Sequence, residues 1–226
     1  MKAVVFDIGA TLVDGPPVAP AKVIASLTGA GYRDVAGIIM RRDFADSDAL
    51  IRALEEELSL SFSPVAREKT KDLWESQFTG CHEINDSSNV LRFFARRHIR
   101  IGLLSDIWRP YYEGVKRAVK DIESLAEAKA LSFCTGHKKP DPYNFRLITE
   151  LLSLEPQEIL MVGDTYSHDI EPAIALGMKT AWLLRRPEKE ADDVIDVING
   201  KKPAPDLTIK DLAGLCGAFP QEEKDK

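Results

Sequence analysis

The chain has 226 residues, of which 44% are hydrophobic and 29% are charged, as in an ordinary soluble globular protein. Its formal net charge of -6 argues against broad electrostatic binding to nucleic acid or to an anionic membrane surface. A small anionic substrate is not excluded, because it needs only a local cationic site.

Neither cysteine usage nor hydropathy points to secretion or to a membrane. Cys81, Cys134 and Cys216 lie far apart and lack any C-x-x-C spacing, so we expect no disulfide framework, no zinc site and a reducing, cytoplasmic location. No apolar run approaches the roughly 18–20 residues that span a membrane. The first apolar run is interrupted at Asp7 and is too short for a signal peptide. The oligomeric state is left open.

The first predicted element is a strand over residues 2–6, with the sequence KAVVF, that ends at Asp7. A continuous apolar run is typical of a parallel strand covered by helices on both faces. Ligands of open α/β sheets bind beyond the carboxyl ends of the strands. Asp7 therefore either lies on the floor of a ligand crevice or simply caps the next segment.

From residue 16 to residue 89 the apolar residues repeat at helical spacing. We predict helices around residues 23–27, 38–39, 50–58 and 64–78. Asp46 is expected to cap the third helix, and Ser63-Pro64 opens the fourth. Because no strand-like alternation appears, we predict an all-helical insertion over residues 16–89.

Strands and helices alternate in the second half of the chain. The predicted strands cover residues 99–104, 130–134, 159–162 and 180–184, and the predicted helices include 90–94, 115–130, 145–154 and 173–175. Such alternation implies right-handed crossovers and a parallel sheet, and hence an α/β fold. The polar segment after Gln221 is expected to fray.

Polar side chains follow several of these strands. Parallel neighbouring strands would bring them to one edge of the sheet. Clustered carboxylates suit Mg²⁺, and a lysine with a hydroxyl suits a phosphoryl group. A carboxylate in such a site can act as a nucleophile and form an acyl phosphate that water then hydrolyses. The residues concerned are Asp7, Ser105, Lys139, Asp164 and Asp169.

Four stretches resemble the motifs of the haloacid dehalogenase superfamily of hydrolases. They are residues 6–12 (FDIGATL), 103–105 (LLS), 136–142 (GHKKPDP) and 163–169 (GDTYSHD), in the family's order and at fitting spacing. The resemblance implies a Rossmann-like core made of residues 1–15 and 90–226. It also implies that residues 16–89 form a helical cap domain, which closes over the site and selects the substrate.

The resemblance also implies a Mg²⁺ site. Asp7 would be the nucleophile and would bind the metal through its other oxygen. Gly9 would contribute its backbone carbonyl, and Asp164 would be the second carboxylate ligand. Asp169 would complete this set by orienting the catalytic lysine or a water molecule on the metal.

The remaining roles fall to hydroxyls and a lysine. Ser105 would bind a phosphoryl oxygen, and Thr11 would brace the first loop. Lys139 would neutralise charge on the nucleophile and the phosphate. Lys138 is the rival for that role, but the adjacent Pro-Asp-Pro favours Lys139.

One position departs from the family pattern. Family phosphatases carry a second aspartate two residues after the nucleophile, as general acid and base, where this chain has Gly9. The loss of such a group typically costs about 10²–10⁴ in rate. The candidates near the motifs for donating the proton instead, each also interpretable as an ordinary surface or loop residue, are Asp14, His137, Tyr166 and His168.

The sequence therefore predicts a Mg²⁺-dependent phosphatase acting on a small phosphorylated metabolite through an aspartyl-phosphate, slowed by Gly9. Two alternatives stay open. One is a dehalogenase or phosphonate-cleaving hydrolase, because those relatives also lack the second aspartate. The other is a binding or regulatory protein that keeps the fold and turns over poorly.

The residues that contact the substrate are harder to predict. Arg41 and Arg42 either reach an anionic substrate from the cap or form a solvated helix face. Aromatic residues are expected to border the entrance or to pack; Trp74 is one, and the group from Trp108 to Tyr112 is the better placed because it follows Ser105.

Overall fold

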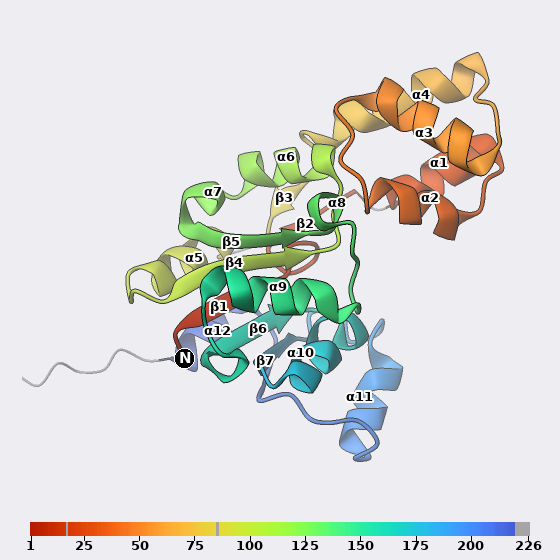
Figure 1. The fold of residues 1–226 in the computed structure, drawn as a ribbon. Coiled ribbons are helices and arrows are strands. Elements are labelled where there is room, and N and C mark those ends of the chain that lie inside the picture. The colour runs from red at the N-terminus through yellow and green to blue at the C-terminus, as the bar shows by residue number, and fades with distance from the viewer. Residues whose placement is uncertain (17, 85, 220–226) are drawn as a thin grey trace, which may run out of the picture.

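The computed structural model describes residues 1–16, 18–84 and 86–219. Within these residues, six strands form one sheet in the order β5-β4-β1-β6-β7-β8, with every neighbouring pair parallel (Figure 1). The predicted parallel α/β fold is confirmed, while the polar segment after Gln221 lies outside the described residues. The strands are β1 (Ala3–Phe6), β4 (Arg100–Ser105), β5 (Ala126–Leu131), β6 (Ile159–Gly163), β7 (Lys179–Leu183) and β8 (Leu207–Ile209).

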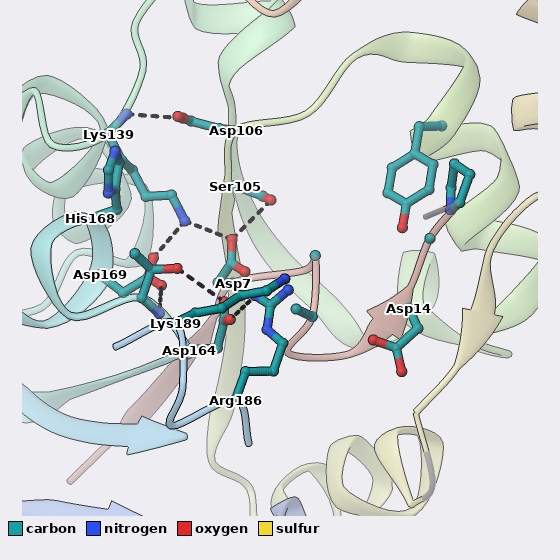
Figure 2. A pocket seen from close by; sticks show the side chains of 16 residues that line it. Asp7, Asp14, Ser105, Asp106, Lys139, Asp164, His168, Asp169, Arg186 and Lys189 are labelled. Carbon is teal, nitrogen blue, oxygen red and sulfur yellow. Dashed lines mark hydrogen bonds and ion pairs between the residues drawn. The ribbon is translucent and has the colours of Figure 1, made fainter. Parts of the chain in front are cut away.

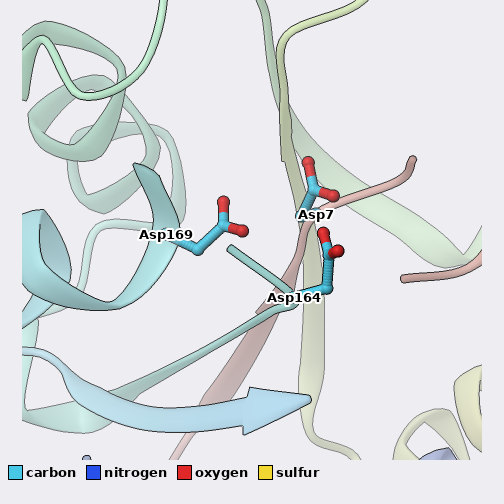
Figure 3. A group of neighbouring side chains, drawn as sticks. All are labelled: Asp7, Asp164 and Asp169. Carbon is cyan, nitrogen blue, oxygen red and sulfur yellow. The ribbon is translucent and has the colours of Figure 1, made fainter. Parts of the chain in front are cut away.

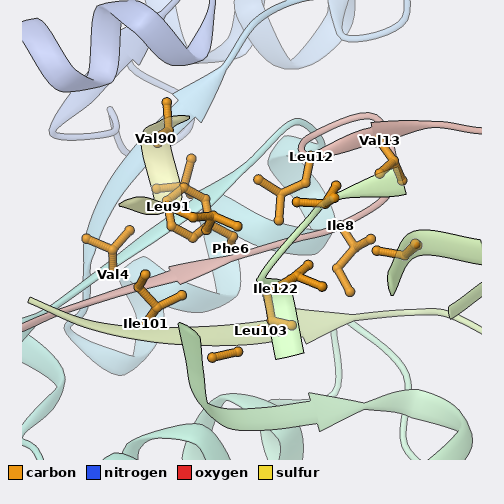
Figure 4. Close-up of a cluster of buried hydrophobic side chains, with 14 of the residues drawn as sticks. Val4, Phe6, Ile8, Leu12, Val13, Val90, Leu91, Ile101, Leu103 and Ile122 are labelled. Atoms are coloured by element: carbon orange, nitrogen blue, oxygen red, sulfur yellow. The ribbon is translucent and has the colours of Figure 1, made fainter. Parts of the chain in front are cut away.

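Helices cover both faces of the sheet, which explains the unbroken apolar run of β1. Val4 and Phe6 join a buried cluster on the face covered by α5, α6, α7 and α12 (Figure 4). Ala3 and Val5 point to the opposite face, against α9 and α10. These helices are α5 (Ser87–Ala95), α6 (Arg109–Ala118), α7 (Ile122–Leu125), α12 (Leu212–Gly217), α9 (Pro142–Leu152) and α10 (Glu171–Leu176).

Four helices between β2 and β3 form a group to the upper right of the sheet in Figure 1, with a hydrophobic cluster of their own. The Asp46 carboxylate accepts a hydrogen bond from the backbone N of Ala49 at 2.7 Å, and Ser63 Oγ accepts from Ala66 N at 3.1 Å, as N-caps do. We call this group the α1–α4 segment. It comprises α1 (Pro20–Thr28), α2 (Tyr32–Ile39), α3 (Ser47–Leu58) and α4 (Pro64–Gln77).

The expectation that residues 16–89 contain no strand needs one correction. The short strands β2 (Val13–Asp14) and β3 (His82–Glu83) pair antiparallel where the chain leaves the sheet and returns to it. A strand of two residues is too short to carry an alternating pattern, so its pairing depends on the approach of two distant segments.

The prediction of a helix over residues 115–130 and a strand over 130–134 is wrong. Helix α6 ends at Ala118, strand β5 already begins at Ala126, and residues 132–135 form α8 (Ser132–Thr135). The sequence of β5, AEAKAL, is rich in helix-forming residues, but pairing with β4 overrides that preference. Strand β8 and helix α11 (Ala191–Ile198) were not predicted. No helix among the described residues combines the length and the apolar character needed to cross a bilayer.

Candidate active site

Asp7 lies directly after the central strand β1 (Figure 2), and two hydroxyl groups donate hydrogen bonds to its carboxylate. Ser105, at the end of the neighbouring β4, donates its hydroxyl to Asp7 Oδ1 at 3.0 Å. Thr11 donates to Asp7 Oδ2 at 3.2 Å from the turn that follows. The backbone N of Asp7 donates to Val162 O of β6 at 2.9 Å. The carboxylate is only 5% exposed and has a defined orientation.

Lys139 reaches the same carboxylate from the loop before α9. Its Nζ lies 2.6 Å from Asp7 Oδ1 and 2.5 Å from Asp169 Oδ1. Its backbone N donates to Asp106 Oδ1 at 2.9 Å, which fixes the loop against the end of β4. Burial opposes the charge of this lysine, but the Asp169 and Asp7 carboxylates outweigh it and raise its pKa. Lys139 lines the cavity above Asp7, whereas its neighbour Lys138 does not.

Asp164 and Asp169 are brought together by the π-helical turn η2 (Tyr166–Ile170) that follows β6. The backbone N of Thr165 donates to Asp169 Oδ2 at 3.0 Å, so the carboxylate folds back over the end of the strand. A glycine at position 163 is required, because a Cβ there would lie 2.4 Å from Asp169 Cγ. Burial raises the pKa of both carboxyl groups, and the charge of Asp7 adds to the effect.

Three buried carboxylates therefore meet at one point. Asp7, Asp164 and Asp169 each offer an oxygen within 4.8 Å of the others (Figure 3). Like charges this close are unfavourable without a cation, and a donor set made only of oxygens suits a hard divalent ion. Gly9 lines the same cavity from the loop after Asp7. These residues fit a Mg²⁺ ion.

The structure adds a cation that the sequence analysis missed. Arg186, in the loop after β7, forms an ion pair with Asp164 Oδ2. Lys189 from the same loop also lines the cavity. The sequence contained a signal for these cations. Their loop begins at the carboxyl end of β7, the strand next to β6, and ligands of parallel sheets bind at this edge.

The cavity above the carboxylates has a volume of about 530 Å³. Of the four residues considered as replacements for the missing acid, Asp14 and His168 line it. Burial and the nearby Lys139 lower the pKa of His168, which favours its neutral form. The other two lie elsewhere: His137 pairs with Asp141 at 2.8 Å, and the Tyr166 hydroxyl donates to Pro203 O at 2.6 Å.

The residues proposed from the sequence to contact the substrate are mostly elsewhere. Arg41 and Arg42 are exposed, and Arg42 forms an ion pair with Glu57. Trp74 and Trp108 pack against each other with ring centroids 5.5 Å apart, and Tyr112 donates to Glu123. From this aromatic group, Tyr111 lines the cavity.

The parallel sheet and the acidic cluster at its carboxyl edge define the chain as a Rossmann-like α/β protein with a candidate ligand site beyond its central strands. A family model described as haloacid dehalogenase-like hydrolase matches residues 1–177. The chain belongs to this family.

Curated relatives include two phosphatases from Pyrococcus species. Glyceraldehyde 3-phosphate phosphatase of Pyrococcus abyssi is 31% identical over 108 residues, 48% of this chain and 45% of the relative. The Pyrococcus furiosus protein of the same name is 27% identical over 139 residues, 60% of this chain and 55% of the relative. The chain thus matches about half the length of these relatives.

Solved structures with the same fold include a phosphatase and a dehalogenase. A phosphatase from Thermococcus onnurineus superposes with a TM-score of 0.62 at 19% identity, covering 98% of this chain and 99% of the other. An L-2-haloacid dehalogenase from Xanthobacter autotrophicus gives a TM-score of 0.59 at 18% identity, covering 96% of this chain and 97% of the other. At these identities the likeness shows the fold alone.

Proposed function

We propose that this protein is a Mg²⁺-dependent phosphatase that hydrolyses a small phosphorylated metabolite through an aspartyl-phosphate on Asp7. The observation that carries the proposal is the Lys139 ammonium, bonded to Asp7 and Asp169 beside a third buried carboxylate, Asp164. This pairing of a cation-binding carboxylate cluster with a fixed ammonium suits a dianionic phosphoryl group. The Pyrococcus relatives support the same class of substrate.

In this proposal each site residue has a separate role in the reaction. Asp7 attacks phosphorus with one carboxylate oxygen, and the bond from phosphorus to the ester oxygen breaks. Ser105 and Lys139 bind the phosphoryl oxygens, and Thr11 keeps the nucleophile in orientation. Water then attacks phosphorus and releases phosphate and free Asp7.

The predicted Mg²⁺ would be held by Asp7, Asp164, Asp169 and the backbone carbonyl of Gly9. Bound there, it supplies electrostatic stabilisation to the transferring phosphoryl group. Because Gly9 replaces the usual acid, the proton for the leaving group must come from water or from a cavity residue, for which Asp14 and His168 are placed. Turnover of esters with poor leaving groups is therefore expected to be slow.

The test is release of p-nitrophenol from p-nitrophenyl phosphate by chelator-treated protein, with and without added Mg²⁺. The expected result is Mg²⁺-stimulated release that Asp7→Asn abolishes, because the amide is not a nucleophile. Asp72→Asn, on an exposed position of α4, is the matched control and should retain full activity.

Other outcomes identify the alternatives. Chloride release from 2-chloropropionate without metal would replace the proposal with a dehalogenase. No turnover of either compound would leave a binding protein. Equal phosphatase rates for Asp7→Asn and the unmodified protein would exclude covalent catalysis at this residue.

A further inference from the structure

The residues that line the cavity come almost entirely from the sheet domain and its loops. Among the described residues, the cavity is lined by Pro16 but by no residue of helices α1 to α4. Its volume of about 530 Å³ lies within the range of whole small-molecule sites, about 300–1,000 Å³, so it accommodates more than a phosphoryl group. Side chains that distinguish substrates are therefore to be sought in the core loops.

The loop after β7 carries two cations into this cavity. The backbone N of Lys189 donates to Arg186 O at 2.9 Å, so one turn sets both side chains on the same wall. The loop is anchored by Glu190, which is 9% exposed and accepts a hydrogen bond from Tyr166 N at 2.8 Å. Because Tyr166 begins η2, this bond ties the cationic turn to the element that carries Asp169.

The two cations are separate from the groups assigned to the transferred phosphoryl group. Figure 2 shows Arg186 and Lys189 on the Asp164 side of Asp7, whereas Ser105 and Lys139 approach from the opposite side. The phosphoryl group already has its own ligands there, so the second pair of cations faces another part of the substrate.

Both cations retain donors for a ligand. In the described part of the chain, Arg186 uses one terminal nitrogen, Nη2, on Asp164, and its other terminal nitrogen, Nη1, forms no hydrogen bond. Lys189 forms no ion pair with the residues that the structure describes. The nearby carboxylates are otherwise engaged: Asp14 pairs with Arg185 at 2.8 Å, and Asp106 accepts the Lys139 backbone N–H.

We propose that Arg186 and Lys189 form a subsite for a second anionic group of the substrate, a carboxylate or phosphoryl group carried on the leaving-group side. The inference rests on the proposed phosphatase function and specifies its substrate class: small phosphate esters with a further negative charge. An arginine fork and an ammonium are the usual partners of such groups.

The kinetic test compares three esters of similar size at saturating Mg²⁺: ethyl phosphate, 2-phosphoglycolate and ethylene glycol bisphosphate. The unmodified protein is expected to show kcat/KM at least about tenfold higher for one or both of the doubly anionic esters, the size of one charge-assisted hydrogen bond. The ester with the higher kcat/KM shows whether the subsite binds a carboxylate or a phosphoryl group.

The variant for this test is Lys189→Ala. The Lys189 side chain is exposed, and its removal leaves the Arg186–Asp164 ion pair intact. We define the preference ratio as kcat/KM for the preferred doubly anionic ester divided by kcat/KM for ethyl phosphate. The substitution should lower this ratio by about tenfold, through a higher KM for the doubly anionic ester. Lys210→Ala is the matched control, because this lysine is also exposed but does not line the cavity. Its preference ratio should match that of the unmodified protein.

A binding measurement separates failure of the subsite from failure of the phosphatase proposal. Calorimetry compares phosphonoacetate with ethylphosphonate, neither of which is a phosphate ester. If no ester is hydrolysed, the phosphatase proposal fails, yet tighter binding of phosphonoacetate that Lys189→Ala abolishes still supports the subsite. If all esters turn over with equal kcat/KM, or both phosphonates bind equally, the subsite is overturned and the phosphatase proposal stands.

Discussion

Gly9 is the residue at which the candidate site departs from the family pattern. A Cβ at this position would meet no atom within 4 Å, so a β-carbon fits there without displacing its surroundings. The neighbouring turn keeps Asp7 in orientation through Thr11, at 3.2 Å. The position can thus accept the β-carbon of the aspartate that family phosphatases carry there.

We expect Gly9→Asp to raise kcat for ethyl phosphate by about tenfold or more, because its alkoxide leaving group needs a proton. The gain with p-nitrophenyl phosphate should be much smaller, since nitrophenolate leaves without one. Steady-state kinetics with both esters measures the difference. Gly9→Ala adds the Cβ without the carboxylate and is the control. An unchanged kcat for ethyl phosphate would mean that Asp14, His168 or water already supplies the proton efficiently.

At the scale of elements, the junction between β6 and η2 determines the geometry of the acidic cluster. Gly163 allows the strand to end directly beneath Asp169, and η2 returns that carboxylate to Lys139 at 2.5 Å. Two residues that are five positions apart in the sequence, Asp164 and Asp169, consequently share one site. A π-helical turn is a recurrent device at functional sites.

Gly163→Ala should displace Asp169, because the new Cβ would lie 2.4 Å from its Cγ. We expect a loss of at least about tenfold in kcat/KM and weaker Mg²⁺ binding by calorimetry, with about 1–3 kcal/mol lost from the free energy of unfolding. Gly37→Ala in α2 is the control, because no atom lies within 4 Å of the added Cβ. Its free energy of unfolding should rise by about 0.5–1 kcal/mol. Wild-type kinetics in Gly163→Ala would show that the junction tolerates a methyl group.

At the scale of the whole molecule, the α1–α4 segment is joined to the sheet by an aromatic contact. Trp74 of α4 packs edge to face on Trp108, which precedes α6, with centroids 5.5 Å apart. Trp108 belongs to the same hydrophobic cluster as the helices of the segment. The predicted role of this segment as a cap domain remains a proposal.

Trp74→Ala should lower the free energy of unfolding by about 3–5 kcal/mol, because the side chain is 4% exposed and leaves a large cavity. Urea titration followed by circular dichroism measures the change. Val65→Ala, in the same helix but 58% exposed, should change stability by no more than about 0.5 kcal/mol. A loss below about 1 kcal/mol for Trp74→Ala would mean that the segment is held by other contacts.

The sequence by itself determined the parallel fold and the central site residues, because both depend on rules that act locally. The apolar run of β1 requires burial on both faces, and residues after parallel strands meet at one edge of the sheet. These rules predict that Asp7, Ser105 and Asp164 meet, as they do in the structure. The N-caps of α3 and α4 were predicted for the same reason, since capping involves residues only a few positions apart.

The tertiary structure alone decided the features that depend on distant contacts. Residues 126–131 favour a helix locally and become a strand only because β4 offers its edge. Among the candidate proton donors, the packing of the loops brought Asp14 and His168 to the cavity and kept Tyr166 away from it. The cationic loop after β7 reaches the site because Glu190 binds the backbone of η2, a contact between side chain and backbone that no local pattern encodes.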